Sequence, residues 1–320
     1  MKYTLAIGIA ISCGVAQTAS AQEVPGDAAV QNQWFTGTLE APSPALPEAG
    51  ILEVEPYAIF TDNNGAYDTK GNFHSAPNVD VFTSVTALKY GLTDRISVQA
   101  LPSLSHVANS LSHYTGLGDL PIDLEYRFND ENNKTGFPSV TASVGLNLPT
   151  GEYDGLHTPL SGFGTGAYNV KEELLFQSLF DTWGHHPMRF RVYGAAYEPI
   201  GNTSVNNVSI YGTSQGFHGR VGPGFSAVLG VGGGYAFDQR WVVALDLVYN
   251  YAHGFALDGT DAMSGLVHSH SGRSTTTALA PALEYNLSGN VGIIAGIEFS
   301  AAGHNSSSYF APQIALSVGF

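Results

Sequence analysis

Charged side chains in this chain recur at every second position inside stretches that are otherwise apolar. In the stretch Asp119–Phe128, for example, Asp123, Glu125 and Arg127 alternate with apolar and aromatic residues. A period of two places such charges on one face of an extended strand. Together they would either set up an electric field that orients polar solutes, or pair with one another and fill a narrow interior. The charged residues that the pattern assigns to polar strand faces are Glu53, Glu55, Asp123, Glu125, Arg127, Lys171, Glu173, Arg189, Arg191, Asp246, Glu284 and Glu298.

Histidines are the other residues whose chemistry suits a site, and most of the 11 fall in or beside predicted polar loops. His268 and His270, with Asp258 or Asp261 nearby in the sequence, are weak candidates for a surface metal site. Nothing in their spacing requires the loops to bring these side chains together. We therefore predict no metal and no cofactor.

The elements that must position the charges are strands of about ten residues, and the alternation recurs about twelve times. Long polar loops, such as Thr61–Ala76 and Ser105–Gly118, alternate with short turns without exception. This predicts an all-β fold, a transmembrane antiparallel up-and-down β-barrel of about 12 strands with both ends in the periplasm. An Arg or Lys on the lipid face costs about 2–4 kcal/mol at mid-membrane, so the polar faces should line the lumen. The register of Asn78–Tyr90 and of Tyr168–Phe180 stays ambiguous.

Two smaller patterns accompany the strands. Tyr90, Tyr235 and Tyr285 each precede a short turn, which indicates an aromatic girdle at the periplasmic interface or simply the ends of ordinary hairpins. The glycine-rich stretch Gly230–Gly234 is not followed by a helix, so it is no phosphate-binding loop. It would let the barrel bend, or let another group approach the wall closely.

The C-terminal stretch Tyr309–Phe320 alternates strictly between apolar residues and small or polar ones, and it ends on an aromatic residue. We predict that it is the closing strand of the barrel and pairs with the first strand, Ile51–Phe60. Phe320 is then predicted to be the signal that the barrel assembly machinery recognises. The partners and location that follow are outer-membrane lipid and the outer membrane of a Gram-negative bacterium.

The N-terminus divides into two segments before the barrel. Residues 1–21 are predicted to be a signal peptide, because Lys2 precedes an apolar run and Ala21 ends a small-residue cleavage site. Residues 22–50 are rich in proline and are predicted to be a periplasmic segment or a plug inside the barrel, which occupies residues 51–320. The only cysteine, Cys13, lies in the signal peptide, so the mature chain has no thiol chemistry.

The net charge of the chain bears on which classes of partner it can bind. The chain carries a net charge of −15, and removal of Lys2 makes it one unit more negative. So acidic a protein is not expected to bind nucleic acid.

Three stretches carry a resemblance to one family: Tyr90–Val98, Gly116–Phe128 and Val144–Gly151. They are similar to the transporter-like outer-membrane proteins grouped under the MetA pathway of phenol degradation. The resemblance runs from about residue 51 to the end, and its motifs mark turns and strands. It implies an outer-membrane barrel and a channel for small organic compounds, aromatic ones included. It supplies no ligand-binding residues.

The first functional hypothesis is a channel or transporter-like barrel for passive uptake or export of small organic compounds. The alternatives are an outer-membrane lipid hydrolase with an active site on its rim, and a structural barrel without transport. Serine and histidine occur together only in loops, as in His268–Ser271 and His304–Ser306. Because hydrolysis requires a nucleophile, a base and an orienting group in one place, we predict no catalytic residue and no enzymatic activity.

Overall fold

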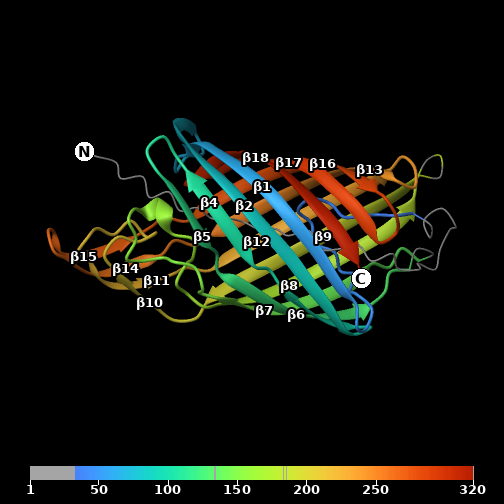
Figure 1. Ribbon diagram of the computed structural model, residues 1–320, viewed down its shortest axis with the longest axis horizontal. Coiled ribbons are helices and arrows are strands. Elements are labelled where there is room, and N and C mark those ends of the chain that lie inside the picture. The colour runs from blue at the N-terminus through green and yellow to red at the C-terminus, as the bar shows by residue number, and fades with distance from the viewer. Residues whose placement is uncertain (1–32, 133–134, 183, 185, 320) are drawn as a thin grey trace.

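A computed structural model describes residues 33–132, 135–182, 184 and 186–319. The predicted signal peptide, residues 22–32 and Phe320 lie outside these ranges. The described chain forms an elongated β-barrel with a smaller sheet at one end (Figure 1). None of the helices in the described ranges has the length and apolar character needed to cross a membrane.

The main sheet closes on itself and has twelve wall strands, all antiparallel, which confirms the predicted fold class. Closure comes from β1, which pairs with β2 on one side and with β18 on the other, so that Tyr57 lies between Val85 and Ala315. The wall strands are β1 (Leu52–Tyr67), β2 (Phe73–Thr93), β3 (Ile96–Ala100), β6 (Leu120–Asn129), β7 (Ser139–Leu148), β8 (Asn169–Asp181), β9 (Pro187–Pro199), β12 (Ser226–Ala236), β13 (Trp241–Ala252), β16 (Ser274–Asn286), β17 (Val291–His304) and β18 (Ser306–Gly319).

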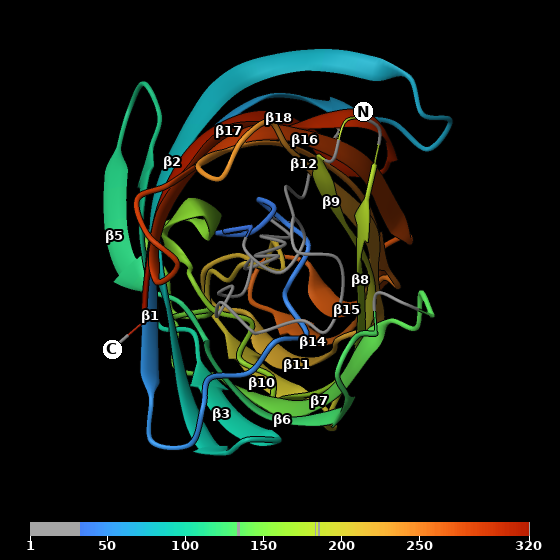
Figure 2. The ribbon, with the colours of Figure 1, turned by 90° about the vertical axis from the view of Figure 1, so that its right-hand side faces the viewer.

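A hairpin of β4 (Ser103–Ala108) and β5 (His113–Leu117) prolongs β3 and β6 beyond two prolines, Pro102 and Pro121. Proline has no N–H to donate to the ladder, and Pro102 separates β3 from β4, while Pro121 lies near the start of β6. The hairpin stands away from the barrel ring (Figure 2), and β5 pairs only with β4 in the described part of the chain. The prediction of a polar loop over Ser105–Gly118 was therefore wrong.

The predicted strict alternation of long loops and short turns was also wrong. β1 continues to Tyr67 and β2 begins at Phe73. Most of the predicted loop Thr61–Ala76 is therefore strand, and only a short turn connects the two. β17 and β18 are separated by a single residue, Asn305, whose φ of 49° suits a tight turn. The physical reason is that strands above the membrane keep their backbone pairing in water, where they need no apolar face. Polar residues in these strands therefore indicate that the strand has left the membrane, and they do not indicate that the strand has ended.

The two longest extracellular connections fold into a second, four-stranded sheet. Its strands are β10 (Thr203–Asn206), β11 (His218–Gly222), β14 (Ala256–Asp261) and β15 (Gly265–His270), and a short 3-10 turn, η1, spans Pro159–Ser161. Val205, Phe217, Val221 and Leu257 form its buried core. Four strands this short leave too little periodic signal to be recognised in sequence.

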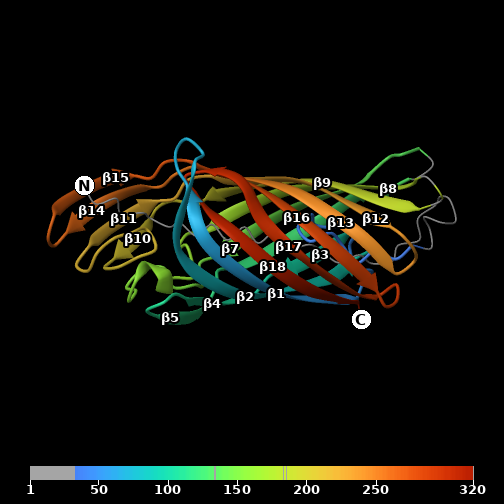
Figure 3. The same cartoon turned by 90° about the horizontal axis from the view of Figure 1, so that it is seen from above.

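The strands of the barrel wall, shown from a second side in Figure 3, carry outward side chains that form an apolar belt. On β13, Leu245 is 53% exposed while the next residue, Asp246, is 0% exposed. This inversion, with apolar side chains outside and charge inside, is the pattern of a lipid-facing wall. The tyrosines that precede short turns lie on this outward face, and the rings of Trp241 and Tyr285 are 4.5 Å apart next to one such turn.

Candidate functional site

All twelve charged residues assigned to polar strand faces lie on the inner face of the barrel wall, each at most 8% exposed. Several meet there as ion pairs between neighbouring strands. Lys171 lies between two carboxylates, 3.0 Å from Asp123 and 2.9 Å from Glu173. Arg189 pairs with Glu284 at 2.7 Å although their strands are not neighbours, so this contact crosses the lumen wall over β12 and β13.

Arg127 differs from the other eleven. Its guanidinium lies 3.1 Å from Asp130 and donates a hydrogen bond to the backbone oxygen of Asp94. Both partners belong to periplasmic turns. Arg127 therefore holds the periplasmic end of the barrel together and does not project into the middle of the lumen.

Some inward polar residues did not stand out in the sequence. Lys89, 2.8 Å from Glu125, lies on the strand whose register was ambiguous, and its cross-strand neighbour Glu53 shows that it faces inward. Gln177 accepts a hydrogen bond from Arg191 at 2.8 Å, yet a neutral amide carries no charge signal in the sequence. Glu172, next to Glu173, faces outward and is exposed at the extracellular end of β8.

The described part of the N-terminal region, residues 33–50, runs inside the barrel (Figure 2). We call it the inner segment. Every residue from Thr36 to Pro47 is buried, and Leu39 and Ala41 are completely so. The composition alone allowed a segment outside or inside the barrel, and residues 33–50 lie inside it.

Wall side chains bind the backbone of the inner segment. Glu284 accepts hydrogen bonds from the N–H groups of Thr36, at 2.9 Å, and Gly37, at 3.2 Å. Asp246 accepts one from the N–H of Glu40 at 2.9 Å. Arg191 donates to the carbonyl oxygen of Ala41 at 2.8 Å. These wall charges therefore replace the hydrogen bonds that a segment without secondary structure would otherwise lack.

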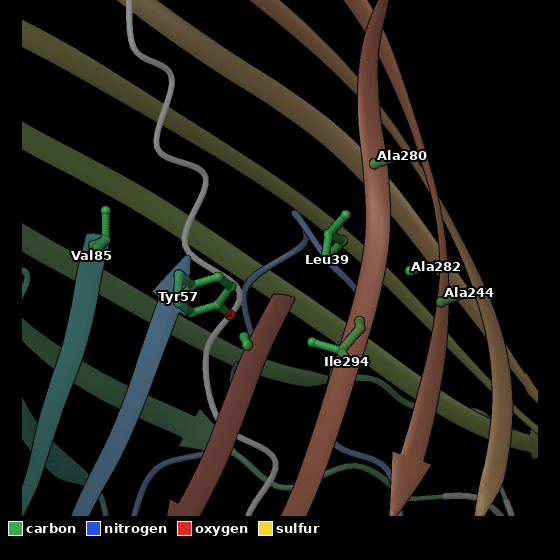
Figure 4. Close-up of a cluster of buried hydrophobic side chains, with 8 residues drawn as sticks. Leu39, Tyr57, Val85, Ala244, Ala280, Ala282 and Ile294 are labelled. Carbon is green, nitrogen blue, oxygen red and sulfur yellow. The ribbon is translucent and has the colours of Figure 1, made fainter. Parts of the chain in front are cut away.

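Side chains of the inner segment add further contacts. Leu39 packs in an apolar cluster with Tyr57, Val85 and Ile294 (Figure 4). The ring of Phe35 lies under the guanidinium of Arg189, 4.5 Å from ring centroid to Cζ, which is a cation–π arrangement.

Glycines in the wall leave room for the inner segment. A Cβ atom at Gly232 would lie 2.1 Å from a carboxylate oxygen of Asp246 and 2.7 Å from the Cβ of Ala41. A Cβ atom at Gly292 would meet the hydroxyl of Thr36. Of the two roles open for the glycine-rich stretch, close approach to the wall is the one these contacts favour.

The side of the lumen formed by β2 and β4 carries several inward valines. Val79, Val81 and Val107 pack there with Leu160 and Phe163 of the extracellular loop that contains η1. Further toward the periplasm on β2, Val85 contacts the cluster around Leu39 of the inner segment. We call the inward residues Val79, Val81, Val85 and Val107 the apolar stripe. It runs from the extracellular mouth toward the inner segment, and one polar pair interrupts it: the hydroxyls of Thr83 and Ser105 lie 3.0 Å apart between Val81 and Val85.

The histidine candidates His268 and His270 lie on β15 of the second sheet. His268 bonds the carboxylate of Asp258, and the His268 and His270 rings are 5.1 Å apart. Across the described residues, no three metal-ligating side chains converge. His304 has Thr275 as its hydrogen-bond partner at 3.2 Å, so neither His268 nor His304 bonds a serine hydroxyl in the described chain.

The lipid-facing belt, the closed sheet and the polar lumen together define a bacterial outer-membrane β-barrel. No family model matches the chain, and no curated protein matches it by sequence.

Solved structures share the fold. The COG4313 outer membrane channel from Pseudomonas putida F1 has a TM-score of 0.61 at 19% identity, over 86% of this chain and 97% of that channel. A mutant of the TodX monoaromatic hydrocarbon channel has a TM-score of 0.50 at 13% identity, over 96% of this chain and 100% of that one. At these identities the likeness is one of fold alone.

Proposed function

We propose that this protein is a passive outer-membrane channel for small apolar organic molecules, aromatic ones included. The observation that carries the proposal is the apolar stripe, because a lumen that passes only ions has no use for buried valines on its inner face from the mouth toward the inner segment. Val81 and Val107 are each only 3% exposed, so the stripe is shielded from bulk water. An apolar solute gains free energy on leaving water for such a surface.

The two sides of the lumen then have different roles. The charged side binds the inner segment through Glu284, Asp246 and Arg191, and the apolar stripe guides the solute as far as Leu39. The inner segment acts as a plug that must shift before a molecule can pass. We propose the twelve inward charges as part of the solute path, and among them Glu284, Asp246 and Arg191 hold the plug.

Likeness in fold agrees with this proposal. Two proteins of the same fold are described as an outer membrane channel and a monoaromatic hydrocarbon channel. The resemblance to the phenol-degradation family would place this chain among transporters of aromatic compounds, and we propose that membership on the three stretches that carry it. A channel requires no catalytic residue, so we also propose that the protein is not an enzyme.

Uptake into cells tests the proposal. Cells that express the full chain should take up a radiolabelled aromatic hydrocarbon faster than cells without it. In planar bilayers, the protein without residues 22–50 should conduct ions more than the full chain. If neither protein conducted ions or passed solutes, the channel function would be excluded.

A substitution in the apolar stripe tests the route. Val81→Asp places a charge among apolar side chains and should lower hydrocarbon uptake about tenfold, since burying an unpaired carboxylate near the path costs more than the ~1.4 kcal/mol that tenfold represents. Val81→Ala keeps the stripe apolar and should preserve uptake. Heat-modifiable migration on gels confirms that both variants are folded. Equal uptake by the two variants would mean that solutes do not follow the stripe.

A further inference from the structure

The outer wall of the barrel carries a groove at the extracellular edge of the lipid belt, away from the lumen. It encloses about 380 Å³ and is bounded by β13, β16, β17 and the turn between β1 and β2. Its lining includes Tyr249, Thr277, Ala302, His304 and Arg273. Because directly opposed residues on antiparallel strands lie on the same face, the strand register shows how the groove is built.

Three rungs cross β13, β16 and β17 on the outward face, and their polarity changes with height. The rung nearest the extracellular end joins Tyr251, Thr275 and His304. The next rung joins Tyr249, Thr277 and Ala302, and the one below it joins Leu247, Leu279 and Phe299. The two upper rungs line the groove, and the rung directly below them is apolar and belongs to the lipid belt.

The groove has an aromatic wall on one side. Tyr249 is 41% exposed and follows the outward apolar residues of β13, so it lies where the lipid belt ends. Tyrosines at that height are characteristic of the membrane interface. The opposite wall is the turn at residues 68–72, which is bonded to the β17–β18 turn through the N–H of Asn305 and the backbone oxygen of Asp68. Gly71 allows this approach, because a Cβ there would lie 3.1 Å from the ring of His304.

Charge at the upper end of the groove is positive in a protein that is otherwise strongly acidic. Arg273 is exposed, and its guanidinium forms no ion pair with any described residue. His304 lies next to it in the groove lining. The nearest carboxylate on the facing turn, Asp68, is held within its own turn by the N–H of Lys70 and by Asn72 and His74. An unpaired cation above an apolar floor matches a molecule with an anionic head and an acyl tail.

We propose that this groove binds the phosphorylated headgroup of an outer-leaflet lipid. Arg273 and His304 donate to the phosphate, and the acyl chains descend over Ala302 and the Leu247 rung into the lipid belt. The position of the groove favours a lipid over a dissolved anion, because the outward rung directly below it, with Leu279 and Phe299, belongs to the lipid belt. The site is separate from the solute path and does not depend on it.

Native mass spectrometry of the full-length mature protein in detergent tests the proposal, with bis-phosphorylated lipid A as the probe. The protein should retain lipid A, and Arg273→Gln should weaken its binding about tenfold, as expected for the loss of one charge-assisted contact. Lipid A stripped of both phosphates should bind as weakly. The matched control is Arg220→Gln, which removes an exposed arginine from the second sheet and should leave binding unchanged.

A second variant separates shape from charge. Ala302→Trp fills the floor of the groove, leaves Arg273 and His304 in place and should also weaken lipid A binding about tenfold. Heat-modifiable migration shows whether each variant is folded. Equal binding of phosphorylated and phosphate-free lipid, or unchanged binding by both Arg273→Gln and Ala302→Trp, would overturn the proposal. Displacement of lipid A by a small aromatic hydrocarbon regardless of Arg273 would make the groove a solute site and would also overturn it.

Discussion

Replacing Glu284 with alanine should release the inner segment from the wall. One carboxylate oxygen of Glu284 accepts the N–H groups of Thr36 and Gly37, at 2.9 and 3.2 Å, in a place where the side chain is 0% exposed. A hydrogen bond to a charged group contributes about 1.5–3 kcal/mol. Taking that value once, because the second bond is long and shares the same oxygen, the released state should gain about 10- to 150-fold in population.

Labelling of a cysteine in the inner segment measures that population. Thr38 is 0% exposed, and the single native cysteine, Cys13, lies in the predicted signal peptide, so Thr38→Cys supplies the only thiol of the mature chain. Its reaction rate with a membrane-impermeant maleimide should rise about 10- to 150-fold in Glu284→Ala, the factor derived above. Ion conductance in planar bilayers should rise in parallel.

The matched control is Glu173→Ala. Glu173 is also a buried lumen carboxylate, 7% exposed, but it pairs with Lys171 and has no hydrogen bond to the described inner segment. Its removal disturbs a lumen ion pair without freeing the backbone of the inner segment. The reasoning would be refuted if Glu284→Ala labelled no faster than Glu173→Ala.

Three further expectations follow from the same geometry and the sequence. Gly232→Val should displace the inner segment by pressing on Asp246, and the displacement should raise ion conductance. A conductance equal to that of the wild-type protein would contradict the close packing at this position. The hydroxyl of Ser214 and two backbone N–H groups lower the pKa of Asp261 from 3.8 to about 2, so the second sheet should be fully stabilised above pH 3.8 and lose this stabilisation as pH falls toward 2. Limited proteolysis across that range should show the loss, and in Ser214→Ala, where the pKa of Asp261 is lowered less, the loss should be smaller and complete at a higher pH. Deletion of Phe320 should reduce the amount of barrel in the outer membrane more than the activity of each inserted molecule, and normal outer-membrane levels would count against its role as an assembly signal.

The barrel could be predicted from sequence because the membrane makes alternation informative. Charge on the lipid face is costly, so Asp123, Glu173 and Arg191 had to face inward wherever the register was clear. On β2 it was not clear, because the inner face carries the apolar stripe and Lys89 together, and apolar residues lie on both faces. The rule that polar residues face the lumen and apolar residues face lipid identified the inward charges. The same rule could not identify the apolar stripe, because its valines face the lumen.

The path of the inner segment could not be predicted for a different reason. Its strongest contacts use backbone groups of Thr36, Gly37, Glu40 and Ala41, and every residue type has such groups. Only the inward glycines, such as Gly232, signalled that something approaches the wall, and they did not say what. Extracellular structure was missed because water removes the requirement for an apolar face there.

The contacts also bear on whether the lumen charges create a field or fill the interior. Lys171, Arg189 and Lys89 each pair with wall carboxylates, and Asp246 and Arg191 bind the backbone of the inner segment. With the segment in place, few charges remain to act on a solute, which favours the filling interpretation. Once the segment leaves, Asp246 and Arg191 lose their partners and the charged side becomes wet. Ion conductance therefore reports release of the inner segment, whereas hydrocarbon uptake reports the state of the apolar stripe. A substitution on the charged side of the lumen should change conductance before it changes uptake, and a substitution in the apolar stripe should do the reverse.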